Sequence, residues 1–106
     1  QKNLTMEKTL LYFSLNDTNR LVAPAKNFLG VDMADATTMQ VSFLEEDGTA
    51  DDVTVQLTVD TTNSSVKEAC RALAGALAGD KKGLTIIADT ENNKFLYPFT
   101  AITAIS

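Results

Sequence analysis

Two neighbouring segments of the chain alternate apolar and polar residues with the two-residue period of a β-strand. They are MQVSFL at 39–44 and VTVQLTV at 53–59. The intervening EEDGTADD, residues 45–52, contains the turn dipeptide Asp47-Gly48 and a single apolar residue. This pattern predicts an antiparallel hairpin in which one face of each strand is exposed to solvent and the tip is acidic and solvated. The hairpin is the strongest constraint on the fold.

Other short segments also carry strand patterns, at 9–15, 20–23, 84–88, 95–99 and 101–105. Pro24 ends the second of these because proline lacks a ladder donor, and Pro98 pushes the fourth toward a sheet edge or a bulge. The NDTN sequence at 16–19 predicts a turn. Residues 24–36 fit neither the strand nor the helix period, so we expect an irregular connection that covers the core.

One helix is expected in SSVKEACRALAGALAG, residues 64–79. Ser65 and Glu68 have the spacing of a capping box, and Gly79 supplies a stop signal. A single apolar stripe is predicted, formed by Val66, Ala69, Cys70, Leu73 and Leu77. The many alanines and Gly75 favour close packing of the helix on a sheet, and they also suit contact with a helix of a partner subunit.

These elements predict a mainly β (α+β) fold. We expect five to six antiparallel strands that form a strongly bent sheet or a small barrel, with the helix packed on it. No linker composition interrupts the chain, so residues 1–106 are expected to form a single domain. Residues 1–6 are expected to be a poorly ordered N-terminal extension, and deletion of residues 1–5 is expected to leave thermal stability unchanged.

The composition of the chain limits the kinds of molecule that it is expected to bind. The net charge of −5 has the wrong sign for binding phosphate backbones or anionic lipids, so nucleic acid is disfavoured. No apolar run approaches the roughly 20 residues that cross a bilayer, and the N-terminus is too polar for a signal peptide. We therefore expect no membrane association and a cytoplasmic or virion location.

Few residues could carry chemistry. The sequence has no histidine, which removes histidine acid–base catalysis and most metal sites. Cys70 lies on the helix stripe and is expected to act as a small hydrophobe and not as a nucleophile. The acidic segment 45–52 matches no EF-hand and is expected to be a solvated tip, with a weak cation site as the alternative. We predict no catalytic, cofactor-binding or metal-ligating residues and no enzymatic activity.

Two further features have alternative interpretations. Lys81-Lys82 is the only basic pair, and no phosphate-binding motif surrounds it. Phe95, Tyr97 and Phe99 alternate as the face of a strand would, and such a face can stack on bases. A core-facing role for these aromatic residues is the favoured interpretation.

The segments KTLLYFSLNDTNRLVAPAKNFLGVDMADATTMQVSF and NSSVKEACRALAGALA resemble small uncharacterised proteins from marine bacteriophages and ocean metagenomes. The likeness spans residues 7–106. The order of elements is also similar to the small barrel of Sm-like proteins. Those proteins begin with their helix and read RNA through loop motifs, whereas here the helix follows the hairpin and the motifs are missing. The resemblance therefore implies a barrel but not RNA binding.

Three functional hypotheses follow. The first is a non-enzymatic structural or interaction protein, such as a phage virion component, that forms a homo-oligomer through strand edges, the small-faced helix or both. The second is an Sm-like module that binds an oligonucleotide or a small ligand. The third, an enzyme that uses acidic residues and a cation, requires acids from separate segments to meet in a cleft.

Overall fold

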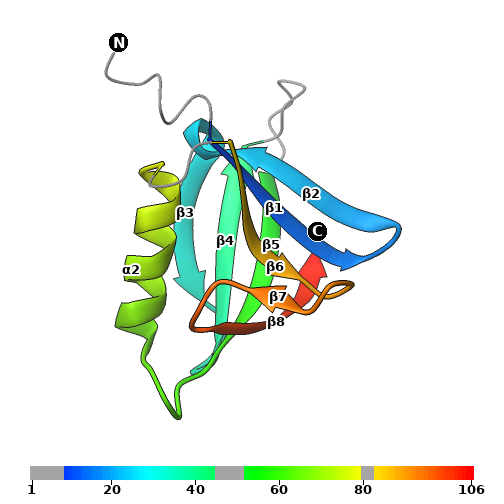
Figure 1. Cartoon of the computed structure of the whole chain (residues 1–106). Coiled ribbons are helices and arrows are strands. Elements are labelled where there is room, and N and C mark those ends of the chain that lie inside the picture. The colour runs from blue at the N-terminus through cyan, green and yellow to red at the C-terminus, as the bar shows by residue number, and fades with distance from the viewer. Residues whose placement is uncertain (1–8, 45–51, 80–82) are drawn as a thin grey trace.

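The structure is a computed structural model that describes residues 9–44, 52–79 and 83–106. These residues form two four-stranded sheets and one α-helix (Figure 1). Sheet A has the strand order β2 (Asn19–Pro24), β1 (Thr9–Asn16), β6 (Gly83–Asp89) and β7 (Lys94–Phe95). Sheet B has the order β3 (Phe28–Met33), β4 (Thr38–Leu44), β5 (Asp52–Val59) and β8 (Phe99–Ile105).

The predicted hairpin is confirmed as β4 and β5. The two strands pair antiparallel in unbroken register from Thr38–Thr58 to Leu44–Asp52. One face of β4 is buried at alternate positions, as the sequence pattern requires. The predicted acidic tip at 45–52 lies outside the described residues except for Asp52.

The mainly β fold with one helix is confirmed, but the predicted arrangement of the strands is wrong in two respects. The strands form two separate sheets and not one bent sheet or a closed Sm-like barrel. In addition, β1 and β6 pair in parallel, although every strand was expected to be antiparallel. The parallel pair arises because four strands and the helix intervene in the sequence, which makes a crossover connection possible.

The segment 24–36 was predicted to be irregular, but its central six residues form the strand β3. A register shift between Phe28 and Gly30 inserts Leu29 as an extra residue opposite β4. This bulge breaks the two-residue period, which explains why the segment did not look like a strand. The 3-10 turn η1 (Ala25–Asn27) joins β2 to β3.

The prediction of one strand at 95–99 is also wrong. β7 ends at Phe95, and β8 begins at Phe99. Between them lies a turn with a cis Tyr97–Pro98 peptide bond, closed by the amide of Phe99 donating to the carbonyl of Leu96 at 2.8 Å. With β3 added and β7 shortened, the chain has eight strands among its described residues instead of five or six.

The core lies between the inner faces of the two sheets. Phe13 of sheet A contacts Phe43 of sheet B with ring centroids 5.7 Å apart, and Phe28 packs edge-on against the same Phe43 ring at 6.0 Å. β8 pairs with β5 and also lies against β1 and β6, so it joins the two sheets along one side. Buried aliphatic residues from both sheets and the helix complete one cluster.

The helix α2 spans Val66–Leu77, and its predicted start and stop are confirmed. The hydroxyl of Ser65 accepts the amide of Glu68 at 3.2 Å, and Gly79 adopts a positive φ of 82°. The carboxylate of Glu68 pairs with Arg71 at 2.6 Å, a contact that the capping-box prediction did not include.

The predicted apolar stripe of α2 needs one correction. Ala69, Leu73 and Ala76 face the core, whereas Cys70 is exposed. The buried stripe runs through Ala76 and not Cys70, because positions 69, 73 and 76 share one side of a helix with 3.6 residues per turn. Cys70 is therefore not the buried small hydrophobe that was expected.

Two exposed turns are held by aspartate side chains. Asp35 accepts the backbone amides of Thr37 and Thr38, each at 2.9 Å. Asp60 accepts the amides of Thr62 and Asn63, each at 3.1 Å. These hydrogen bonds, the amide of Thr37 for Asp35 and that of Asn63 for Asp60 foremost, lower the pKa of both carboxyl groups below the ordinary value of 3.8.

We expect replacement of buried Leu57 by alanine to lower the free energy of unfolding by about 2–5 kcal/mol, because it leaves a cavity between the sheets. The matched control is Leu29→Ala, since Leu29 is 51% exposed and its loss should cost less than about 1 kcal/mol. Urea denaturation measures both. Equal losses would contradict the assignment of Leu57 to the core and Leu29 to the surface.

The turn aspartates predict a pH dependence. Because their folded pKa values lie below the unfolded one, their stabilisation is present above the unfolded pKa and is lost as the pH falls through the folded pKa. The Asp35→Asn, Asp60→Asn double variant should therefore lose less melting temperature than the wild type between about pH 6 and about pH 2.5. Identical losses, measured by circular dichroism, would show that these carboxylates do not contribute.

Candidate interaction surface

The outer face of sheet A, which faces away from sheet B, carries apolar side chains on three adjacent strands. In the register, Leu10 of β1 lies beside Pro24 of β2 and Leu84 of β6. Tyr12 lies in the same way beside Val22 and Ile86. We call these residues the apolar face: Leu10, Tyr12, Val22, Pro24, Leu84 and Ile86.

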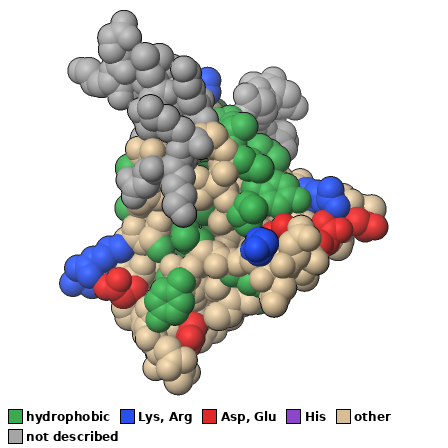
Figure 2. Space-filling view, viewed as in Figure 1, with side chains coloured by type: hydrophobic (Ala, Val, Ile, Leu, Met, Phe, Trp, Pro, Cys, Tyr) green, Lys and Arg blue, Asp and Glu red, His purple; other side chains and the backbone are tan. Residues whose placement is uncertain are grey.

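Much of the apolar face is in contact with solvent. The exposed fraction is 54% for Leu84, 49% for Val22 and 36% for both Leu10 and Ile86. Figure 2 shows hydrophobic side chains gathered on this side of the molecule, over the region where β1, β2 and β6 lie in Figure 1. None of the residues of the apolar face is charged. A surface of this kind marks an interaction site more often than scattered exposed hydrophobic residues do.

A polar group of side chains borders the apolar face at one end. Arg20 of β2 pairs with Glu91, which follows β6, with 2.6 Å between Nη2 and Oε1. The hydroxyl of Ser14 on β1 donates to the same carboxylate oxygen at 3.2 Å. The apolar face is therefore closed at this end by an arginine on the β2 side and a glutamate on the β6 side.

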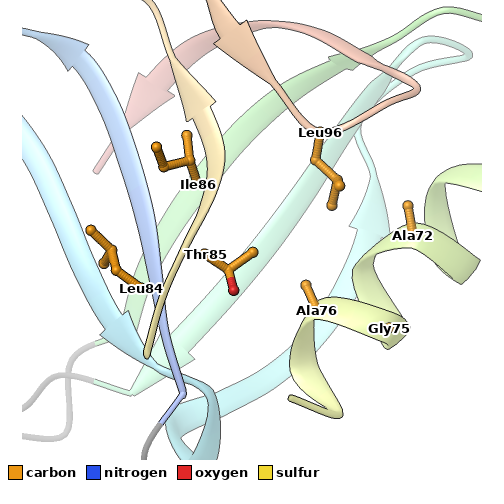
Figure 3. A pocket seen from close by; sticks show the side chains of 7 residues that line it. All are labelled: Ala72, Gly75, Ala76, Leu84, Thr85, Ile86 and Leu96. Carbon is orange, nitrogen blue, oxygen red and sulfur yellow. The ribbon is translucent and has the colours of Figure 1, made fainter. Parts of the chain in front are cut away.

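Beside the apolar face, a groove separates β6 from α2. It has a volume of about 370 Å³. Figure 3 shows its lining residues, which come from the helix, from β6 and from the turn after β7: Ala72, Gly75, Ala76, Leu84, Thr85, Ile86 and Leu96. Because Leu84 and Ile86 belong to both surfaces, the groove continues the apolar face toward the helix.

The groove is lined almost entirely by apolar side chains. Thr85 supplies the only polar side chain among the lining residues, and none of them is an acid, a base or a thiol. Within residues 9–44, 52–79 and 83–106, no three metal-ligating side chains lie close enough together to hold an ion. The small side chains of Ala72, Gly75 and Ala76 leave the space open, which gives the alanine-rich helix a second role besides core packing.

The residues singled out from the sequence do not assemble into a site. Cys70 is exposed on α2, away from the groove lining. Phe99 is buried and Phe95 half-buried, so the expected core-facing role is confirmed for these two. Tyr97 is 63% exposed and donates its hydroxyl to the carbonyl of Asn63 at 3.1 Å. The three aromatic residues therefore form no shared stacking platform. Glu45, Glu46, Asp47, Asp51 and the Lys81-Lys82 pair lie outside the described residues.

Sequence reasoning did not identify the apolar face. The signal was present, because Leu10 and Tyr12 alternate with the core residues Leu11 and Phe13, which gives β1 two apolar sides. Alternation alone does not decide which of the two sides a second layer covers, and the side of Leu10 and Tyr12 is the surface described above.

None of the described helices is both long enough and apolar enough to cross a membrane. Comparison of the chain with protein-family models, curated proteins and solved structures gives no match.

Proposed function

We propose that the protein is a non-enzymatic structural or interaction protein that self-assembles, and that copies meet through the apolar face. The observation that carries this proposal is that four exposed and two half-buried apolar residues lie together on one side of three adjacent strands. Burying them against a second copy removes apolar surface from water at a gain of about 25 cal/mol per Å².

The charge of the chain favours the same surface. Copies with a net charge of −5 repel one another, so close contact is least opposed where a surface carries no charge. The apolar face is such a surface. The resemblance to marine phage proteins makes a virion component one setting in which this assembly would serve.

The strand edges, which were the other expected route to assembly, are poorly suited to it. β2 ends in Pro24, which has no amide to donate, and β3 is interrupted by its bulge. β7 has two residues, and β8 lies against sheet A. The part of β6 beyond β7 faces α2 across the groove. The outer face of sheet A is therefore better suited to self-assembly than the strand edges are.

Self-assembly predicts a mass in solution at least twice the chain mass of 11.4 kDa, measured by light scattering behind a sizing column. Leu84→Asp should shift the protein to monomer, because it places a charge in the contact. The matched control is Leu29→Asp, since Leu29 is similarly exposed but lies on β3. High salt should not dissociate an apolar contact.

Two results would contradict the proposal. The wild type could be monomeric at all concentrations tested, which removes self-assembly. Alternatively, Leu29→Asp could dissociate the assembly while Leu84→Asp does not, which would move the contact to sheet B. Circular dichroism of both variants shows whether they are folded.

The groove favours a second candidate function, the binding of a small apolar ligand. Its volume of about 370 Å³ lies in the range of small-molecule sites. Its lining is apolar apart from Thr85, which suits a ligand with few polar groups. An oligonucleotide fits less well, because neither the groove lining nor the apolar face offers a positive charge.

Ligand binding can be tested with the neutral apolar dye Nile red. We expect its fluorescence to rise with the wild type and the rise to shrink at least severalfold with Ala72→Leu, which fills the groove. Ala74→Leu is the matched control, since Ala74 is exposed on the same helix and does not line the groove. Equal binding by both variants would place the dye elsewhere.

A further inference from the structure

We infer that two copies pack the outer faces of their A sheets together about a two-fold axis that lies between the two faces and runs parallel to β1. In this arrangement β1 lies over β1 of the other copy, and β2 lies over β6 of the other copy. The inference rests on the proposed self-assembly and specifies its partner and geometry.

The layout of the apolar face is suited to pairing with itself. It consists of two rows of three residues, with β1 in the middle and one strand on each side. A half-turn about β1 exchanges the β2 and β6 sides, so each row falls on the same row of the other copy. Val22 then lies over Ile86, and Tyr12 lies over Tyr12. An interface of this kind uses the same patch on both copies.

The charges at the end of the face favour this axis over others. Arg20 lies on the β2 side and Glu91 on the β6 side. A half-turn about β1 brings Arg20 of one copy over Glu91 of the other, so opposite charges meet at the rim. A half-turn about an axis across the strands would instead lay this charged end over Leu10 and Pro24, where it has no partner.

A head-to-tail contact would need a second apolar surface of similar extent. Among the described residues, the other exposed large hydrophobic side chains are dispersed over β3, the end of β4 and the turn before β8: Leu29, Val31, Leu44 and Tyr97. None of these positions forms a face three strands wide. The best complement to the apolar face is therefore another copy of the apolar face.

The available area predicts a reversible dimer. An eight-residue β1 is roughly 26 Å long and the three strands of the face are roughly 14 Å wide, so they cover about 360 Å² in projection. Stable interfaces bury about 800 Å² on each partner. The contact must therefore extend past Leu84 and Ile86 over the groove toward α2, and we expect it to dissociate on dilution.

Site-specific cross-linking tests the geometry. The background is Cys70→Ser, which removes the exposed native thiol. Facing sheets lie about 10 Å apart, too far for a disulfide but within reach of a short bis-maleimide. At a concentration where the mass is doubled, Tyr12→Cys should give cross-linked dimer in most chains. Thr103→Cys, exposed on β8, is the control and should give little.

The outcomes separate this inference from the proposal on which it rests. Leu10→Cys provides a second position on β1 if Tyr12→Cys does not fold. A doubled mass in which neither β1 cysteine links more than Thr103→Cys would overturn the two-fold axis and leave self-assembly standing. A monomeric mass at all concentrations would overturn both.

Discussion

The contact between Phe13 and Phe43 packs the two sheets against each other in one core. Each sheet has a buried inner face that is stable only against another apolar layer. Phe13 comes from the middle of sheet A and Phe43 from the hairpin of sheet B, and their rings meet at 5.7 Å. β8 joins the sheets along one side, and buried residues of α2 complete the core. The outer face of sheet A is then fixed as the side that this core does not use.

The features that could be predicted from the sequence are local ones. The hairpin, the turn at 16–19 and the ends of α2 depend on residues close together in the chain, and all three are present. The assignment of strands to two sheets depends on contacts between distant residues. The parallel pairing of β1 with β6 joins segments more than sixty residues apart, and no local pattern specifies it. The strand β3 was missed because its bulge removes the period on which the prediction relies.

The apolar face was difficult to predict for a related reason. Alternation shows that Leu10 and Leu11 lie on opposite sides of β1, but it does not show which side a second layer covers. Leu84 and Ile86 become part of the same surface only through the parallel register with β1. The groove adds Ala72 and Gly75 from the helix, whose small size was attributed to close packing on a sheet or against a helix of a partner subunit. Tertiary arrangement, and not composition, determines the surface.

The position of the exposed apolar residues also limits the kind of assembly that the fold can form. Open β-filaments grow through unpaired strand edges, and here proline, a bulge and shortness limit those of β2, β3 and β7. A face that pairs with itself about a two-fold axis is fully used by one partner, so the assembly closes at two copies. A larger particle would need a second contact, and the dispersed side chains of Leu29, Val31 and Tyr97 offer only small ones. In the proposed assembly, the dimer is therefore the unit from which any larger structure would be built.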